Sequence, residues 1–190
     1  KGTDFALNSL AQMQEGVAVL AAADGRVAAF RDGVEDMLYT PDNAFNVAGK
    51  ECGNGVVINH SGGWQTQYCH LKKGSVSVVK GQNVKAGDML GQVGISGKTQ
   101  FPHVHLSVRK GNLVIDPFSP KGRLSCDPKP QDTLWDDLPI YEPGGLISVG
   151  FSDSVPEFDD VKAGILDPDN ITTASPAFGA LCPSLWNAHR

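Results

Sequence analysis

Glycine and proline interrupt the whole chain, and this limits what it can fold into. The 190 residues include 22 glycines and 12 prolines, together more than a sixth of the chain, spread along its length. Such frequent interruption favours many short strands joined by turns over long helices. Only two short helical stretches are expected, over residues 8–14 and 184–189. The sequence therefore predicts an all-β fold.

Composition excludes several classes of protein. A hydrophobic content of 41% and a net charge of −5 are typical of an ordinary globular domain and do not suggest a basic nucleic-acid surface. The longest apolar run, residues 16–23, is too short to cross a bilayer, so no membrane span is expected. The chain starts with lysine and shows no signal peptide, so a mature or trimmed product is expected.

Alternating apolar residues and turn residues indicate how the strands are arranged. Two hairpins are expected, the first pairing 17–22 with 26–31 around Asp24-Gly25, the second pairing 55–59 with 64–68. Residues 33–51 are polar and irregular, which indicates a long loop of the kind that often lines a binding groove. Further strands are predicted over 76–79, 89–93, 103–108 and 113–115.

The composition changes after Pro120, where proline, aspartate and lysine become frequent. We therefore place a first domain at residues 1–120 and a C-terminal extension at 121–190. Strands are expected in the extension over 146–151 and 161–166. The extension could belong to the first domain or begin a truncated second one.

The four cysteines permit three pairings. Cys52 and Cys69 flank the second predicted hairpin, which would bring them close together, so we favour Cys52–Cys69. That choice leaves Cys126–Cys182 to tie the C-terminal extension. An even count of cysteines in this arrangement favours an oxidising compartment over four free buried thiols.

The most informative local pattern is His103-Val104-His105. Side chains alternate along a strand, and the flanking apolar residues favour a strand, so both imidazoles would project from one face. Imidazole is the commonest metal ligand and a competent acid or base near neutral pH. Asp4 and His70 are candidates to complete a site. His60, at a hairpin turn, is interpreted as structural, and His189 as incidental.

These segments together resemble the LytM/lysostaphin-like (M23) zinc metallopeptidases. The resemblance covers residues 1 to about 120 and none of the extension. The matching pieces occur in the family's order. They are Gly2-x-Asp4, 19–27, 53–60, Tyr68-x-His70-Leu71, 84–94, Ser96-Gly97, Pro102-His103-x-His105-Leu106 and Asp116-Pro117.

The resemblance implies a role for each site residue. Asp4 and His105 match two ligands of the family's catalytic Zn²⁺, while His70 and His103 match the pair that assists catalysis. The family's first histidine ligand would occupy the position just before Lys1, and we expect it to be present upstream. The resemblance also implies an antiparallel sheet with a groove, of the duplicated hybrid motif type. His70 would lie on a strand whose opposite face carries Cys69.

The function implied by the resemblance is zinc-dependent hydrolysis of peptide cross-links in bacterial peptidoglycan, whose peptide stems would be the substrate. A periplasmic or secreted location fits the paired cysteines, and D,D-endopeptidase specificity is favoured over cleavage between glycines. One alternative is a non-catalytic protein that binds cell wall or activates another hydrolase. A carrier domain of lipoyl or phosphocarrier type is a further alternative, but no lysine sits in the hairpin setting that a lipoyl carrier needs.

Overall fold

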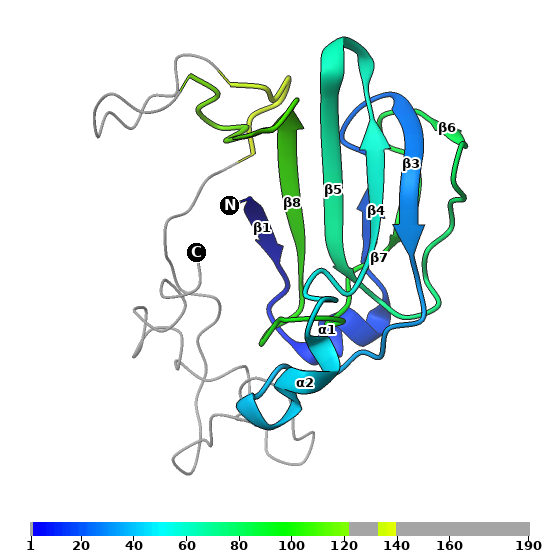
Figure 1. The fold of residues 1–190 in the computed structure, drawn as a ribbon, viewed down its shortest axis with the longest axis vertical. Helices are drawn as coiled ribbons and strands as arrows, with labels where there is room; N and C mark the ends of the chain where they lie inside the picture. Colours follow the sequence, from blue (N-terminus) through cyan, green and yellow to red (C-terminus); the bar gives the residue numbers. More distant parts are fainter. Residues whose placement is uncertain (1, 122–132, 140–190) are drawn as a thin grey trace, which may run out of the picture.

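A computed structural model describes residues 2–121 and 133–139, and they form a mostly antiparallel β-structure with few helices (Figure 1). This confirms the predicted all-β class. The strands within these residues are β1 (Thr3–Ala6), β2 (Ala18–Leu20), β3 (Gly25–Arg31), β4 (Asn54–Asn59), β5 (Trp64–Leu71), β6 (Asn83–Val84), β7 (Met89–Gln92), β8 (His103–Lys110) and β9 (Leu113–Ile115).

The helices are all short. They are α1 (Leu10–Glu15), α2 (Ala44–Val47) and the 3₁₀ turns η1 (Pro41–Asn43) and η2 (Ser61–Gly63). The hydroxyl of Ser9 accepts the Gln12 N–H and starts α1, which buries Met13. This confirms the expected N-terminal helix. None of the described helices has both the length and the apolar character that a membrane crossing requires.

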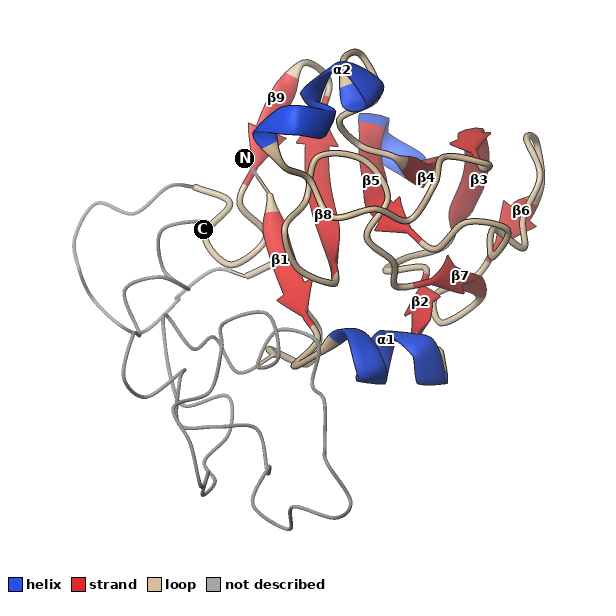
Figure 2. Cartoon of the chain, turned by 90° about the horizontal axis from the view of Figure 1, so that it is seen from below, coloured by secondary structure: helices blue, strands red, loops and turns tan. Residues whose placement is uncertain are grey.

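Seven strands form one sheet in the order β1-β8-β5-β4-β3-β6, with β9 also pairing with β8. Because β1 and β9 pair with different parts of β8, the first and last described strands both lie beside it. Strands β2 and β7 form a separate two-stranded sheet. In Figure 2 this small sheet and helix α1 lie on one side of the large sheet, and helix α2 lies on the other.

The hydrophobic core lies between the two sheets. Tyr68 on β5 pairs with Leu106 on β8, so both side chains share a face, and both are buried. They pack with Val19 of β2 and Leu90 of β7. The Tyr68 hydroxyl accepts the Ala22 N–H at 2.8 Å. The opposite face of β8 is therefore left for His103 and His105.

Two strand predictions are wrong. The segments 17–22 and 26–31 do not form a hairpin, because β2 pairs with β7 while β3 pairs with β4 and β6. Alternation identified both strands but did not identify their partners. Residues 76–79 are not a strand, although Val78 is buried in the core.

The other strand predictions within the described residues agree with the structure. The 55–59/64–68 hairpin is β4–β5, and β8 and β9 form the last hairpin. The 33–51 segment is mostly irregular but contains η1 and α2. The predicted disulfide Cys52–Cys69 is present. The Cys126–Cys182 pairing, the two strands predicted in the extension and the helix predicted at 184–189 lie outside the described residues.

Candidate metal centre

Strand pairing brings Asp4 and His105 together from opposite ends of the domain. Asp4 of β1 lies directly opposite His105 of β8 in the antiparallel register. Directly paired residues present their side chains on the same face. Nδ1 of His105 lies 2.6 Å from Oδ1 of Asp4, across 101 residues of sequence. The four residue pairs between β1 and β8 therefore create this contact.

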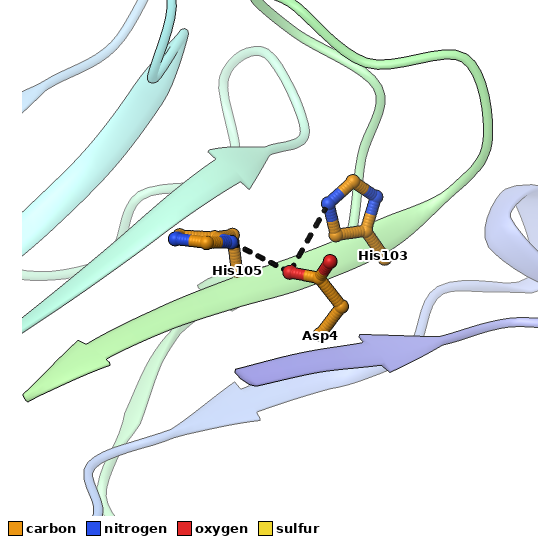
Figure 3. A group of neighbouring side chains, drawn as sticks. All are labelled: Asp4, His103 and His105. Atoms are coloured by element: carbon orange, nitrogen blue, oxygen red, sulfur yellow. Dashed lines mark hydrogen bonds and ion pairs between the residues drawn. The ribbon is translucent and has the colours of Figure 1, made fainter. Parts of the chain in front are cut away.

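His103 completes a cluster on the same face. Figure 3 shows both imidazoles of β8 turned toward Asp4 of β1. Nε2 of His103 lies 3.7 Å from Oδ1 of Asp4. The three residues each offer one potential ligand atom, and these atoms lie within 4.8 Å of one another. The prediction that His103 and His105 share a face is confirmed.

His70 also lies beside this cluster, by a route that alternation does not predict. Its ring centroid is 4.7 Å from that of His103 and 6.2 Å from that of His105. Its backbone φ is +64°, a left-handed conformation that is uncommon for a residue other than glycine. This conformation breaks the alternation at the end of β5. Cys69 pairs directly with His105, so the expectation that Cys69 lies on the face opposite the site is wrong.

Hydrogen bonds to main-chain carbonyls set the tautomers of two histidines. Nδ1 of His70 donates to the Ser96 carbonyl at 2.8 Å, and Nδ1 of His103 donates to the Phe101 carbonyl at 3.0 Å. A carbonyl oxygen can only accept, so each Nδ1 carries the proton of the neutral ring. Nε2 of each ring is then the basic nitrogen, and in His103 this nitrogen lies 3.7 Å from Oδ1 of Asp4.

The environment keeps these two imidazoles neutral in the metal-free protein. Burial, helped by the neighbouring His103, lowers the pKa of His70 to about 4. Burial likewise lowers the pKa of His103, although the Phe101 carbonyl and Asp4 oppose this change. Burial would raise the pKa of Asp4, but the His105 hydrogen bond and the surrounding imidazoles outweigh it, so the pKa is lowered.

The donor set suits a zinc ion. A carboxylate oxygen and imidazole nitrogens at the base of a partly buried site are ligands that Zn²⁺ prefers. In the metal-free state His105 Nδ1 and Asp4 Oδ1 share a hydrogen bond. A metal cation that binds both atoms would displace the proton of this bond. The other ring nitrogen, Nε2, lies 3.2 Å from the Ser107 hydroxyl, which helps orient the ring.

Several residues that support the site have contacts that the sequence does not reveal. Thr99 is buried, and its hydroxyl donates to the Phe101 carbonyl and lies 3.1 Å from His103 Nδ1. Ser96 and Gly2 are among the residues that carry the family resemblance, but the sequence did not show what they contact. A carbonyl acceptor such as that of Phe101 has no sequence signature, because every residue has one.

Several known proteins are similar in sequence to this chain. The cell division protein DipM of Caulobacter vibrioides is 33% identical over 106 residues, which are 56% of this chain and 15% of DipM. The peptidoglycan DD-endopeptidase ShyA of Vibrio cholerae is 34% identical over 133 residues, covering 65% of this chain and 25% of ShyA.

Among solved structures, a zinc-containing peptidase from Vibrio cholerae matches 60% of this chain and 28% of that chain, with 28% identity and a TM-score of 0.43. Of the two relatives named above, DipM and ShyA, the chain spans a quarter or less of the length. The model of peptidase family M23 matches residues 1–117, well over half of the chain. The protein therefore belongs to peptidase family M23.

Proposed function

We propose that the protein is a zinc-dependent endopeptidase that hydrolyses peptide cross-links of bacterial peptidoglycan. The observation that carries this proposal is the placement of two basic imidazole nitrogens, from His70 and His103, beside the Asp4–His105 pair. Family membership supports peptide-bond hydrolysis, and ShyA, a relative over 65% of this chain, is named as a peptidoglycan DD-endopeptidase. D,D-endopeptidase specificity is the form we favour.

In this proposal Asp4 and His105 hold the metal through Oδ1 and Nδ1. The resemblance to the family implies a third ligand, a histidine at the position that would precede Lys1. A bound zinc ion would supply a Lewis acid that polarises the scissile carbonyl and acidifies water. His105 Nε2 keeps its contact with the Ser107 hydroxyl, which leaves Nδ1 for the metal. The orientation of the ring is therefore compatible with coordination through Nδ1.

His70 and His103 act on protons in this proposal. Each is neutral at neutral pH, so its Nε2 can accept the proton of the attacking water. The imidazolium that results can donate to the oxyanion that forms at the scissile carbonyl, and can then pass the proton to the leaving amine. The Ser96 and Phe101 carbonyls keep Nδ1 protonated throughout, which leaves Nε2 for this transfer.

A periplasmic or secreted location belongs to the same proposal. The Cys52–Cys69 disulfide supports it, because such bonds persist in oxidising compartments. Peptidoglycan lies in those compartments in bacteria, so the substrate and the location are consistent.

The test is digestion of purified muropeptides of both cross-link types by a chain extended upstream of Lys1, with and without chelator. His105→Ala and Asp4→Ala should lose metal and activity together. His70→Ala and His103→Ala should keep the metal and lose turnover. His60→Gln is the matched control, because His60 bonds the Asp24 carbonyl and the Thr66 hydroxyl, away from the cluster.

The results separate the proposal from its alternatives. Turnover retained in all four site variants would refute the assignment. Metal binding without hydrolysis of either cross-link type, combined with sedimentation onto sacculi, would instead support a non-catalytic wall-binding protein. Loss of metal in His103→Ala would make His103 a third ligand rather than a proton carrier.

A further inference from the structure

Trp135 packs against the domain core although it lies beyond the part of the chain that the family model matches. That match ends at residue 117. The Trp135 ring nevertheless packs against the hydrophobic core. Its centroid is 5.7 Å from that of Phe118 and 6.1 Å from that of Phe5, which it meets edge to face at 86°. The family domain alone therefore does not include all the residues that cover this core.

Backbone hydrogen bonds fix the segment that carries this indole. The Leu134 N–H donates to the Pro117 carbonyl at 2.9 Å, and the Thr133 hydroxyl donates to the same carbonyl at 3.2 Å. The Trp135 N–H donates back to the Thr133 hydroxyl at 3.1 Å. Pro117 closely follows β9, which pairs with β8. The segment is thus anchored to the β8–β9 hairpin, while its indole reaches β1.

The residue that Trp135 contacts on β1 is the immediate neighbour of Asp4. Phe5 pairs with Val104, so its side chain lies on the core face, while Asp4 faces the metal cluster from the other side. Strand β1 has only four residues, and within the described part of the chain β8 is its only partner strand. A strand this short needs side-chain packing to stay in place.

We propose that Trp135 is a positioning residue that holds β1, and with it Asp4, against β8 by packing on Phe5. This inference rests on the proposed function, in which Asp4 is a metal ligand. Part of the C-terminal extension thereby becomes a component of the metal centre, acting from the opposite face of the sheet. Loss of the indole leaves β1 attached by its backbone pairing to β8 and by its remaining contacts.

The indole nitrogen indicates that packing, and not hydrogen bonding, is what Trp135 contributes. Nε1 of Trp135 is buried and has no hydrogen-bond partner among the described residues. A buried N–H without a partner is unfavourable. Phenylalanine at this position would remove that group and keep an aromatic ring against Phe5. Trp135→Phe is therefore expected to preserve the positioning role, whereas Trp135→Ala is expected to lose it.

Amide hydrogen exchange on the metal-free 190-residue chain tests the packing. Trp135→Ala should speed exchange of the β1 amides about tenfold relative to those of β4, because β1 opens locally. Trp135→Phe should match the wild type. Trp64→Ala is the matched control. Trp64 is also partly buried against this core, but it lies at the start of β5, far along the strand from His70, with the Lys110 ammonium over its ring.

Metal affinity in the upstream-extended chain tests the link to Asp4. Trp135→Ala should weaken Zn²⁺ binding by about tenfold, as loss of an outer contact does. Trp64→Ala and Trp135→Phe should bind like the wild type. Equal effects of the two alanine variants, on exchange or on affinity, would overturn the proposal. If the wild type binds no metal, the proposed function fails, and a selective effect on β1 exchange would still support the positioning of β1 by Trp135.

Discussion

The Ser96 main-chain carbonyl accepts the Nδ1–H of His70 at 2.8 Å, and this bond sets the tautomer and the direction of the His70 ring. Ser96 is itself fully buried. Its hydroxyl donates to the Leu71 carbonyl at 2.7 Å and accepts the Asn54 N–H at 2.9 Å. The position of His70 therefore depends on a buried polar network that no proposed catalytic residue supplies.

Ser96→Ala should destabilise the protein and slow turnover more than it weakens metal binding. The variant keeps the carbonyl that holds His70 but removes the acceptor of the buried Asn54 N–H. Leaving a buried donor unpaired costs about 1–3 kcal/mol. Urea unfolding gives this loss, and kinetics at saturating zinc give the effect on turnover. Ser77→Ala is the control, because the exposed Ser77 hydroxyl also bonds a carbonyl, that of Met89.

Metal-free protein should lose stability as the pH falls from 6.5 toward 4. The pKa of His70 is lowered from 6.5 to about 4, chiefly by burial, so the folded state disfavours the charged form. The unfolded chain takes up its proton first, and stability that is complete above pH 6.5 falls by about 3 kcal/mol once both states are protonated. His103 acts in the same direction, because burial also lowers its pKa.

Denaturant unfolding in the presence of chelator, repeated across this pH range, measures that loss. His70→Asn is the informative comparison, because its amide can still donate to the Ser96 carbonyl but does not titrate. The pH dependence between 6.5 and 4 should be clearly shallower in this variant. An unchanged slope would show that His70 does not cause the loss.

The sequence predicted those parts of the fold that follow from local alternation. His103 and His105 share a face because a strand alternates with period two, and the β4–β5 hairpin brings Cys52 and Cys69 together. Alternation gives no information about the partner of a strand, so it placed β2 and β3 in one hairpin, although they belong to different sheets.

The sequence could not predict how His70 reaches the site. Its positive φ turns the chain at the end of β5, and a histidine is only a weak signal for this conformation, which a few per cent of non-glycine residues adopt. The supporting contacts of the site were also hidden, because the acceptors for His70 and His103 are main-chain carbonyls. The packing of Trp135 on Phe5 joins segments 130 residues apart, which no local pattern records.

Gly2→Ala should weaken metal binding by about tenfold or more, the range seen when support of a ligand is lost. A Cβ at residue 2 would overlap the His105 ring and would lie 2.7 Å from the Leu106 carbonyl oxygen. The His105 ring cannot swing away without breaking its contacts with Asp4 and Ser107. Competition with a chromophoric chelator measures the affinity. Gly91→Ala on β7 is the control, since its added Cβ meets no atom closer than 3.2 Å.

Removing the Cys52–Cys69 disulfide should destabilise the domain and loosen His70. The bond closes a sequence separation of 17 residues, and a loop of this size contributes about 3 kcal/mol. It also holds the turn whose Cys52 carbonyl accepts the His70 N–H at 2.9 Å. Reductant should therefore lower the free energy of unfolding of the wild type. In the Cys52→Ala/Cys69→Ala variant, any remaining effect of reductant would report on Cys126 and Cys182. A wild-type stability that does not respond to reductant would contradict this prediction.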